Sequence, residues 1–176
     1  MRLTQRTVNF IRFTAIGLFF IYLSILLYLT IFKRLYYASV TGLFLESYQF
    51  DRMFEYGFNL VPFRGIYMYL TNPPSFNIAM TNLVGNILAF VPMGFLLPVI
   101  SEKARHYVQV ILLSLSSSLI IEVLQLLLRV GSTDVDDLIL NTLGGLIGYI
   151  GFYIVSRIIV RITTEEKEGD PPCASP

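Results

Sequence analysis

The sequence is poor in charged residues, and this scarcity defines its class. Of its 176 residues, 55% are hydrophobic and only 14% are charged. A soluble domain carries about a quarter of its residues as Asp, Glu, Lys and Arg. The few basic residues form no patch that phosphates could contact, which excludes a nucleic-acid partner. The composition therefore predicts a membrane protein, and the length predicts one domain.

Tryptophan is absent, and histidine and cysteine each occur once. The single cysteine, Cys173, excludes an intramolecular disulfide and a cysteine-bound metal cluster. The single histidine, His106, lies in a short polar loop, so a histidine-dependent metal site or catalytic triad is not expected. The run DVDD at 134–137 lacks the further ligand pattern of a divalent-cation site. We predict neither a metal nor another cofactor.

Four apolar runs are long enough to cross a bilayer as helices, which takes about 20 residues. They cover about residues 11–32, 78–100, 107–128 and 138–160. The predicted fold is all-α, a four-span transmembrane helical bundle formed by residues 1–162. Residues 163–176 are acidic and contain proline, and are predicted to form a disordered polar tail.

The connection between the first two runs is too long for a plain loop. Within it, the segment FNLVPFRGIYMYL (58–70) is apolar and rich in tyrosine, and is interrupted by Pro62 and Gly65. This pattern predicts a short interfacial or re-entrant helix in the first extracytoplasmic loop.

The basic residues predict which side of the membrane each loop occupies, because they are enriched on the cytoplasmic side. With four spans, one side holds Arg2, Arg6, Arg12, Lys103, Arg105, Arg157, Arg161 and Lys167. The other side holds Lys33, Arg34, Arg52, Arg64 and Arg129. The bias predicts a multi-pass protein of the cell membrane with both termini in the cytoplasm.

Three of the spans carry polar residues spaced three or four apart, which places them on one helix face. These are Asn82 and Asn86 in the second span, Glu122, Gln125 and Arg129 in the third, and Asp137 and Asn141 in the fourth. At 1.5 Å per residue, Asn82 and Asn86 lie roughly 6 and 12 Å below the outer end of their helix, and Glu122 about 10 Å below Arg129. All three sets therefore fall in the outer half of the membrane.

Polar groups in hydrocarbon are costly unless paired, so these faces are expected to turn toward one another. The prediction is a polar cup open to the extracytoplasmic side. Its ligand-binding residues would be Asn82, Asn86, Glu122, Gln125, Arg129, Asp134, Asp137, Asn141 and Arg64.

Simpler interpretations compete with this one. Asp134 and Asp136 stand where acidic residues cap a helix N-terminus. The amides could serve only to join helices. Glu122 must either pair with a cation, for which Arg129 is the candidate, or stay protonated. In the fourth span, Gly144 and Gly148 form a GxxxG motif, which is typical of a helix-packing face.

The segments NLVGNILAFVPMGFLLP and IEVLQLLLRVGSTDVDDLILNTLGG together resemble the VanZ-like membrane proteins, as does the upstream NLVPF. The shared pattern is an asparagine-bearing span with a Pro-x-Gly element, then Glu-x-x-Gln, then an Asp-rich turn leading to Asn-Thr-x-Gly-Gly. The resemblance covers about residues 58–150. Its motif positions here are Asn59, Pro62, Phe63, Asn82, Asn86, Pro92, Gly94, Glu122, Gln125, Asp134, Asp137, Asn141 and Gly145. The pattern does not require an arginine at position 129.

The resemblance implies a role at the bacterial cell envelope, since the family is named for a teicoplanin-resistance protein of Gram-positive bacteria. The first hypothesis is a protein that binds a membrane lipid headgroup or a lipid-linked cell-wall component. The second is an enzyme acting on an amphiphilic substrate, with Glu122 and Asp137 as the candidate acid and base. The third is a small proton-coupled transporter with Glu122 as proton carrier. The pattern assigns no oligomeric state.

Overall fold

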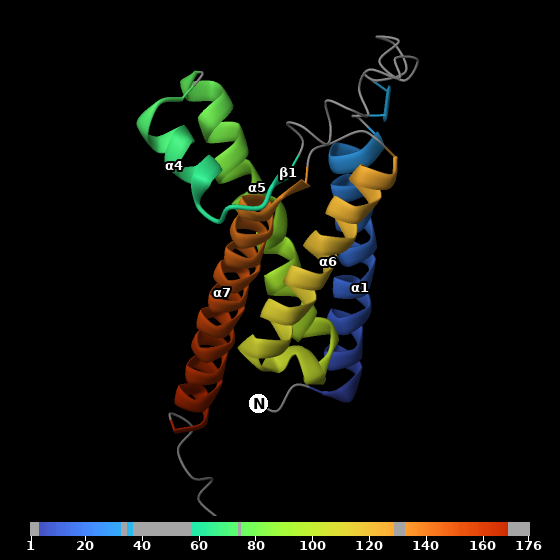
Figure 1. The fold of residues 1–176 in the computed structure, drawn as a ribbon. Helices are drawn as coiled ribbons and strands as arrows, with labels where there is room; N and C mark the ends of the chain where they lie inside the picture. Colours follow the sequence, from blue (N-terminus) through green and yellow to red (C-terminus); the bar gives the residue numbers. More distant parts are fainter. Residues whose placement is uncertain (1–3, 33–34, 37–57, 74, 129–132, 169–176) are drawn as a thin grey trace, which may run out of the picture.

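The structure is a bundle of four long helices with one short helix at one end (Figure 1). The computed structural model describes residues 4–32, 35–36, 58–73, 75–128 and 133–168. The helices are α1 (Gln5–Leu27) with its π-helical continuation η1 (Tyr28–Phe32), α4 (Arg64–Thr71), α5 (Phe76–Ile100), the 3-10 helix η2 (Glu102–Arg105), α6 (Tyr107–Leu127) and α7 (Val135–Glu168). Two short strands, β1 (Phe58–Asn59) and β2 (Thr133–Asp134), pair in parallel.

The four-span, all-α prediction is confirmed. The segments Gln5–Phe32, Phe76–Ile100, Tyr107–Leu127 and Val135–Ile162 are each long and apolar enough to cross a membrane. The first helix begins before the predicted span because the Thr4 side chain accepts a hydrogen bond from the backbone N–H of Thr7 and caps it. At the other end of the chain, α7 continues through residues 163–168, past the predicted beginning of the polar tail. Residues 169–176 lie outside the described residues.

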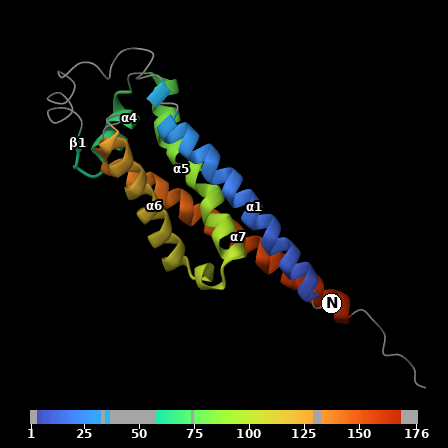
Figure 2. The ribbon, with the colours of Figure 1, turned by 90° about the vertical axis from the view of Figure 1, so that its right-hand side faces the viewer.

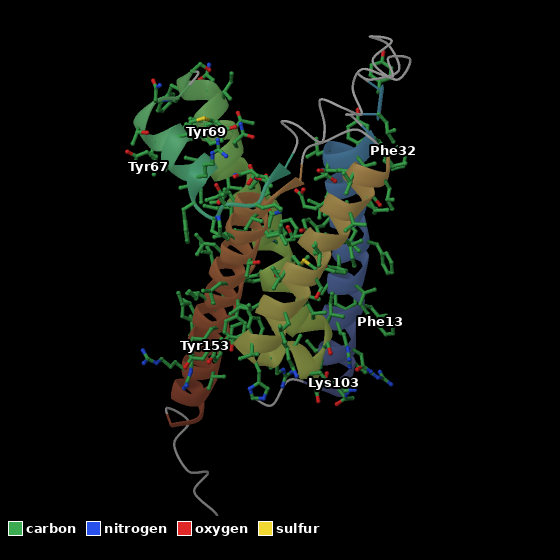
Figure 3. The ribbon with its side chains drawn as sticks, in the orientation of Figure 1. Phe13, Phe32, Tyr67, Tyr69, Lys103 and Tyr153 are labelled. Carbon is green, nitrogen blue, oxygen red and sulfur yellow. The ribbon has the colours of Figure 1, made fainter. Side chains whose placement is uncertain are left out.

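The two ends of the bundle differ in character. The N-terminal end of α1 and the C-terminal end of α7 lie at one end, and α4 with β1 lies at the opposite end (Figures 1 and 2). Lys103, in the turn between α5 and α6, belongs to the end that holds the termini (Figure 3). The predicted segment 58–70 forms β1, a turn and α4, so its helical part is confirmed, while its place at a membrane surface stays a prediction.

Aliphatic and aromatic side chains join α1, α5 and α6 into a core. Leu26, Phe90, Met93 and Ile121 are buried together. Phe13, by contrast, is 72% exposed on the outer face of α1, as expected of a side chain that meets lipid (Figure 3). The bundle therefore has a small buried core and an outer surface that is also apolar.

Glycines set the close contact between α5 and α7. A Cβ atom added at Gly144 would lie 2.1 Å from the carbonyl oxygen of Ile87, and one at Gly148 would lie 2.0 Å from that of Val91. On the α5 side, a Cβ atom added at Gly94 would lie 1.9 Å from the carbonyl oxygen of Gly145 in α7. The prediction that the GxxxG motif is a packing face is confirmed.

A methyl group at Gly148 should therefore destabilise the bundle. We expect Gly148→Ala to lower the free energy of unfolding by about 1–3 kcal/mol, because the two backbones must separate. Gly85→Ala is the matched control, since nothing lies within 4 Å of an added Cβ there. Equilibrium unfolding in mixed detergent micelles measures both variants. Equal stabilities would contradict the proposed contact.

Candidate functional site

Polar side chains from five elements meet at the end of the bundle that carries α4. They come from β1, α5, α6, β2 and the beginning of α7. We call them the polar cluster, which consists of Asn59, Asn86, Glu122, Asp134, Asp136 and Asp137. Direct hydrogen bonds connect its members or attach them to the short helix α4.

Asp136 is the most deeply buried aspartate of the polar cluster, with 2% of its surface exposed. Its Oδ1 accepts the backbone N–H of Phe63 at 2.5 Å. Its Oδ2 accepts those of Gly65 at 2.6 Å and Ile66 at 3.0 Å. These N–H groups belong to the first turn of α4, where a helix has no internal acceptors and its dipole favours an anion. Asp136 therefore fastens the N-terminus of α4 to that of α7.

The backbone before α4 is shaped for this contact. Phe63 has a φ of +66°, in the left-handed region that non-glycine residues adopt infrequently. This conformation turns successive N–H groups toward one acceptor. At the next position, a Cβ added to Gly65 would lie 2.9 Å from Oδ2 of Asp136. Gly65 is therefore required by the close approach of the carboxylate.

Asp134 has two structural roles. Its Oδ1 accepts the backbone N–H of Asp136 at 2.9 Å, so it caps α7 as the simpler interpretation expected. The same oxygen accepts the Nδ2–H of Asn59 at 2.8 Å, and Asn59 is its partner in the β1–β2 pair. The backbone N–H of Asp134 is in turn directed at Oε2 of Glu122, at 3.3 Å. Asp134 thus joins β1, α6 and α7.

The two residues proposed for chemistry lie in different surroundings. Glu122, on α6, is buried with 3% of its surface exposed. Asp137 is only partly buried, and its Oδ1 accepts a hydrogen bond from Nδ2 of Asn86 on α5. The predicted meeting of Asn86 with the α7 aspartates is therefore present as a direct contact between two spans.

Two further predicted residues bridge helices below or beside the polar cluster. Asn141 donates from Nδ2 to Oγ of Ser118 at 2.8 Å, and both side chains are buried between α6 and α7. Gln125 donates from Nε2 to the backbone carbonyl of Thr30 in η1, at 3.1 Å. Both contacts fit the simpler interpretation that amides join helices.

Two of the predicted residues that the structure describes lie apart from the polar cluster. Asn82 donates to the carbonyl of Ile78, one turn earlier in its own helix, at 2.9 Å. Arg64 is exposed in the first turn of α4. Arg129 lies outside the described residues, so its predicted pairing with Glu122 stays a prediction.

Sequence reasoning missed Asp136, Ser118 and Tyr69 as parts of this region. Tyr69 lies on the side of α4 toward α5, whereas Tyr67 is on the outer side (Figure 3). Burial, and then the negative charges of Asp134 and Asp137, raise the pKa of Tyr69 above its ordinary value. The N-terminus of the predicted short helix favours a nearby anion, but this general rule does not say which carboxylate supplies it.

The donor set does not indicate a metal centre. Among the described residues, no three His, Cys, Asp or Glu side chains are grouped so that they could hold an ion. The carboxylates of Asp134 and Asp136 instead accept backbone and amide N–H groups. These two carboxylates are therefore engaged by donors of the protein itself.

The cap at Asp134 can be tested by stability. Asp134→Ala should lower the free energy of unfolding by about 1–2 kcal/mol, because α7 loses its N-cap and Asn59 loses its acceptor. Asp134→Asn should cost less, since asparagine is also a good N-cap. Unfolding in mixed micelles gives both values. An alanine variant as stable as the asparagine variant would contradict the capping role.

Comparison with known proteins places this geometry in a family. The family model VanZ/LLP1 matches residues 19–156, a range that includes α5, α6 and the polar beginning of α7. Protein VanZ of Enterococcus faecium is 30% identical over 132 residues, which cover 75% of this chain and 69% of that protein. No solved structure matches the chain. The chain belongs to the VanZ/LLP1 family.

Proposed function

We propose that this protein acts at the bacterial cell envelope and lowers susceptibility to glycopeptide antibiotics such as teicoplanin. In this proposal the polar cluster faces the extracytoplasmic side and binds a membrane lipid headgroup or a lipid-linked wall component. The relative in Enterococcus faecium and the family pattern support the link to resistance. The polar cluster supports the binding role.

The observation that carries the proposal is the placement of carboxyl groups inside a membrane bundle. Glu122 is buried on one span, and Asp137 on another accepts a hydrogen bond from Asn86 on a third. Ionisable side chains within transmembrane segments are expensive, and they are retained where they contact a ligand or an ion. Three spans that present polar groups at one end of the bundle therefore indicate a site.

The chemistry of these groups limits the ligand. Carboxylates accept hydrogen bonds from hydroxyl, amide and ammonium groups, and asparagine side chains both donate and accept. Sugar hydroxyls, peptide N–H groups and amine-bearing headgroups all offer such donors. An amphiphile would place its acyl or polyprenyl chain along the exposed apolar faces of the helices while its polar part reaches the polar cluster.

A catalytic role is the second candidate, favoured by the unequal surroundings of two carboxyl groups. Glu122 is buried and Asp137 is partly buried. Such a difference allows one group to hold a proton while the other accepts one, which is how enzymes assign the roles of acid and base. Turnover of a labelled wall precursor by the purified protein in lipid would distinguish this from binding alone.

Antibiotic susceptibility tests the proposed function directly. Expression of the wild type in a susceptible Gram-positive host should raise the inhibitory concentration of teicoplanin. Glu122→Gln and Asp137→Asn should return it to the level of cells without the protein, because the ligand loses its charged acceptors. Glu102→Gln is the matched control, since this exposed carboxylate lies in η2 between α5 and α6. Wild-type resistance in both site variants, at equal expression, would contradict the site.

The proposed orientation can be tested with single cysteines. In a Cys173→Ser background, which removes the one native cysteine, we expect Tyr67→Cys to react with a membrane-impermeant maleimide in intact cells. Lys103→Cys, at the opposite end of the bundle, should react only after the cells are permeabilised (Figure 3). The reverse pattern would place the polar cluster on the cytoplasmic side.

A further inference from the structure

The described hydrogen bonds that join the short helix α4 to the bundle lie at its N-terminal end. None of its side chains is fully buried, and Tyr67 and Leu70 are 68% and 67% exposed. Its first turn, by contrast, donates backbone N–H groups to the buried carboxylate of Asp136. This carboxylate therefore holds the N-terminal end of α4 against the beginning of α7.

Asp136 is not needed to cap its own helix. The cap of α7 is supplied by Asp134, which accepts the backbone N–H of Asp136. The carboxylate of Asp136 instead leaves α7 and satisfies three N–H groups at positions 63, 65 and 66. Its role is thus the attachment of α4.

The attachment determines where Tyr69 lies. Tyr69 is on the side of α4 toward the bundle. Burial, and then the negative charges of Asp134 and Asp137, raise the pKa of its hydroxyl. Tyr67 points to the other side (Figure 3). If the N-terminal turn of α4 were released, the ring of Tyr69 would no longer be held on the side that faces the bundle.

We propose that Asp136 is a positioning residue that holds α4 so that the hydroxyl of Tyr69 forms part of the same ligand site as Glu122 and Asp137. The proposal rests on the proposed function. The hydroxyl would donate to or accept from the polar part of the ligand that the carboxylates bind. The ligand site then includes a residue of α4, a helix that is not one of the four candidate membrane spans.

Hydrogen exchange tests the attachment without any ligand. In lipid nanodiscs, Asp136→Asn should raise the exchange of amides in a peptide covering residues 60–71 roughly tenfold, because a neutral acceptor binds these N–H groups less strongly than a charged one. Asp137→Asn is the matched control: it makes the same chemical change one residue away and should leave this peptide unchanged. A peptide from residues 140–150 in α7 should stay protected in both variants, which separates local release from unfolding of the bundle.

Teicoplanin susceptibility tests the role of Tyr69. Tyr69→Phe removes only the hydroxyl and should reduce resistance as Glu122→Gln does, with unchanged exchange of the 60–71 peptide. Tyr67→Phe, the same change on the outer side of α4, should retain wild-type resistance. Asp136→Asn should lose resistance together with the protection of α4.

The outcomes separate this inference from the function on which it rests. Equal exchange of the 60–71 peptide in the wild type and Asp136→Asn would overturn the attachment. Full resistance in Tyr69→Phe, while Glu122→Gln loses it, would overturn the role of Tyr69 and leave the proposed function intact. A wild type that confers no resistance would overturn the proposed function and the part of Tyr69 in it, whereas hydrogen exchange would still decide the attachment of α4.

Discussion

The carboxylate of Asp136 connects the short helix α4 to the four-helix bundle. It accepts three backbone N–H groups from the start of α4 and is itself the second residue of α7, so the N-termini of two helices converge on one place. Each N-terminus carries the positive end of a helix dipole. This convergence gives a physical reason why the beginning of α7 tolerates Asp134, Asp136 and Asp137 close together in an otherwise apolar span. The negative charge at the beginning of α7 is therefore stabilised by backbone dipoles and by the amide side chains of Asn59 and Asn86.

Different residues join α5 and α7 at two levels of the bundle. Toward the middle, glycines bring the backbones of α5 and α7 together, and an added Cβ at Gly144 or Gly148 would meet a carbonyl oxygen. Near the α4 end the same two helices are joined by a hydrogen bond between Asn86 and Asp137. The glycine contact sets how closely the helices approach, and the polar contact adds a side-chain link at the level of the polar cluster. Asn86 and Gly94 therefore contact the same partner helix in different ways.

The fold could be predicted because long apolar runs in a sequence indicate membrane-spanning helices. The helical spacing of Asn86, Glu122 and Asp137 likewise predicted that polar faces from three spans would meet, since unpaired polar groups are costly in hydrocarbon. At two positions the structure shows contacts that the spacing did not predict, and both have physical causes. Asn82 shares a face with Asn86, yet it bonds to the carbonyl of Ile78 in its own helix, an alternative that spacing does not exclude. Asp136 was omitted because its partners are backbone N–H groups some 70 residues earlier in the chain, and backbone groups leave no mark in a side-chain pattern.

The four carboxylates of the polar cluster divide into two kinds. Asp136 accepts backbone N–H groups on both of its oxygens, and Asp134 caps α7 while accepting from Asn59. A ligand that drew on either carboxylate would have to disrupt a helix terminus. Asp137 contacts an asparagine side chain, and the described contact of Glu122 is a longer hydrogen bond from a backbone N–H. Either contact can rearrange without removing a helix cap. The proposed function therefore assigns ligand chemistry to Glu122 and Asp137, while the other two aspartates hold helix ends in place.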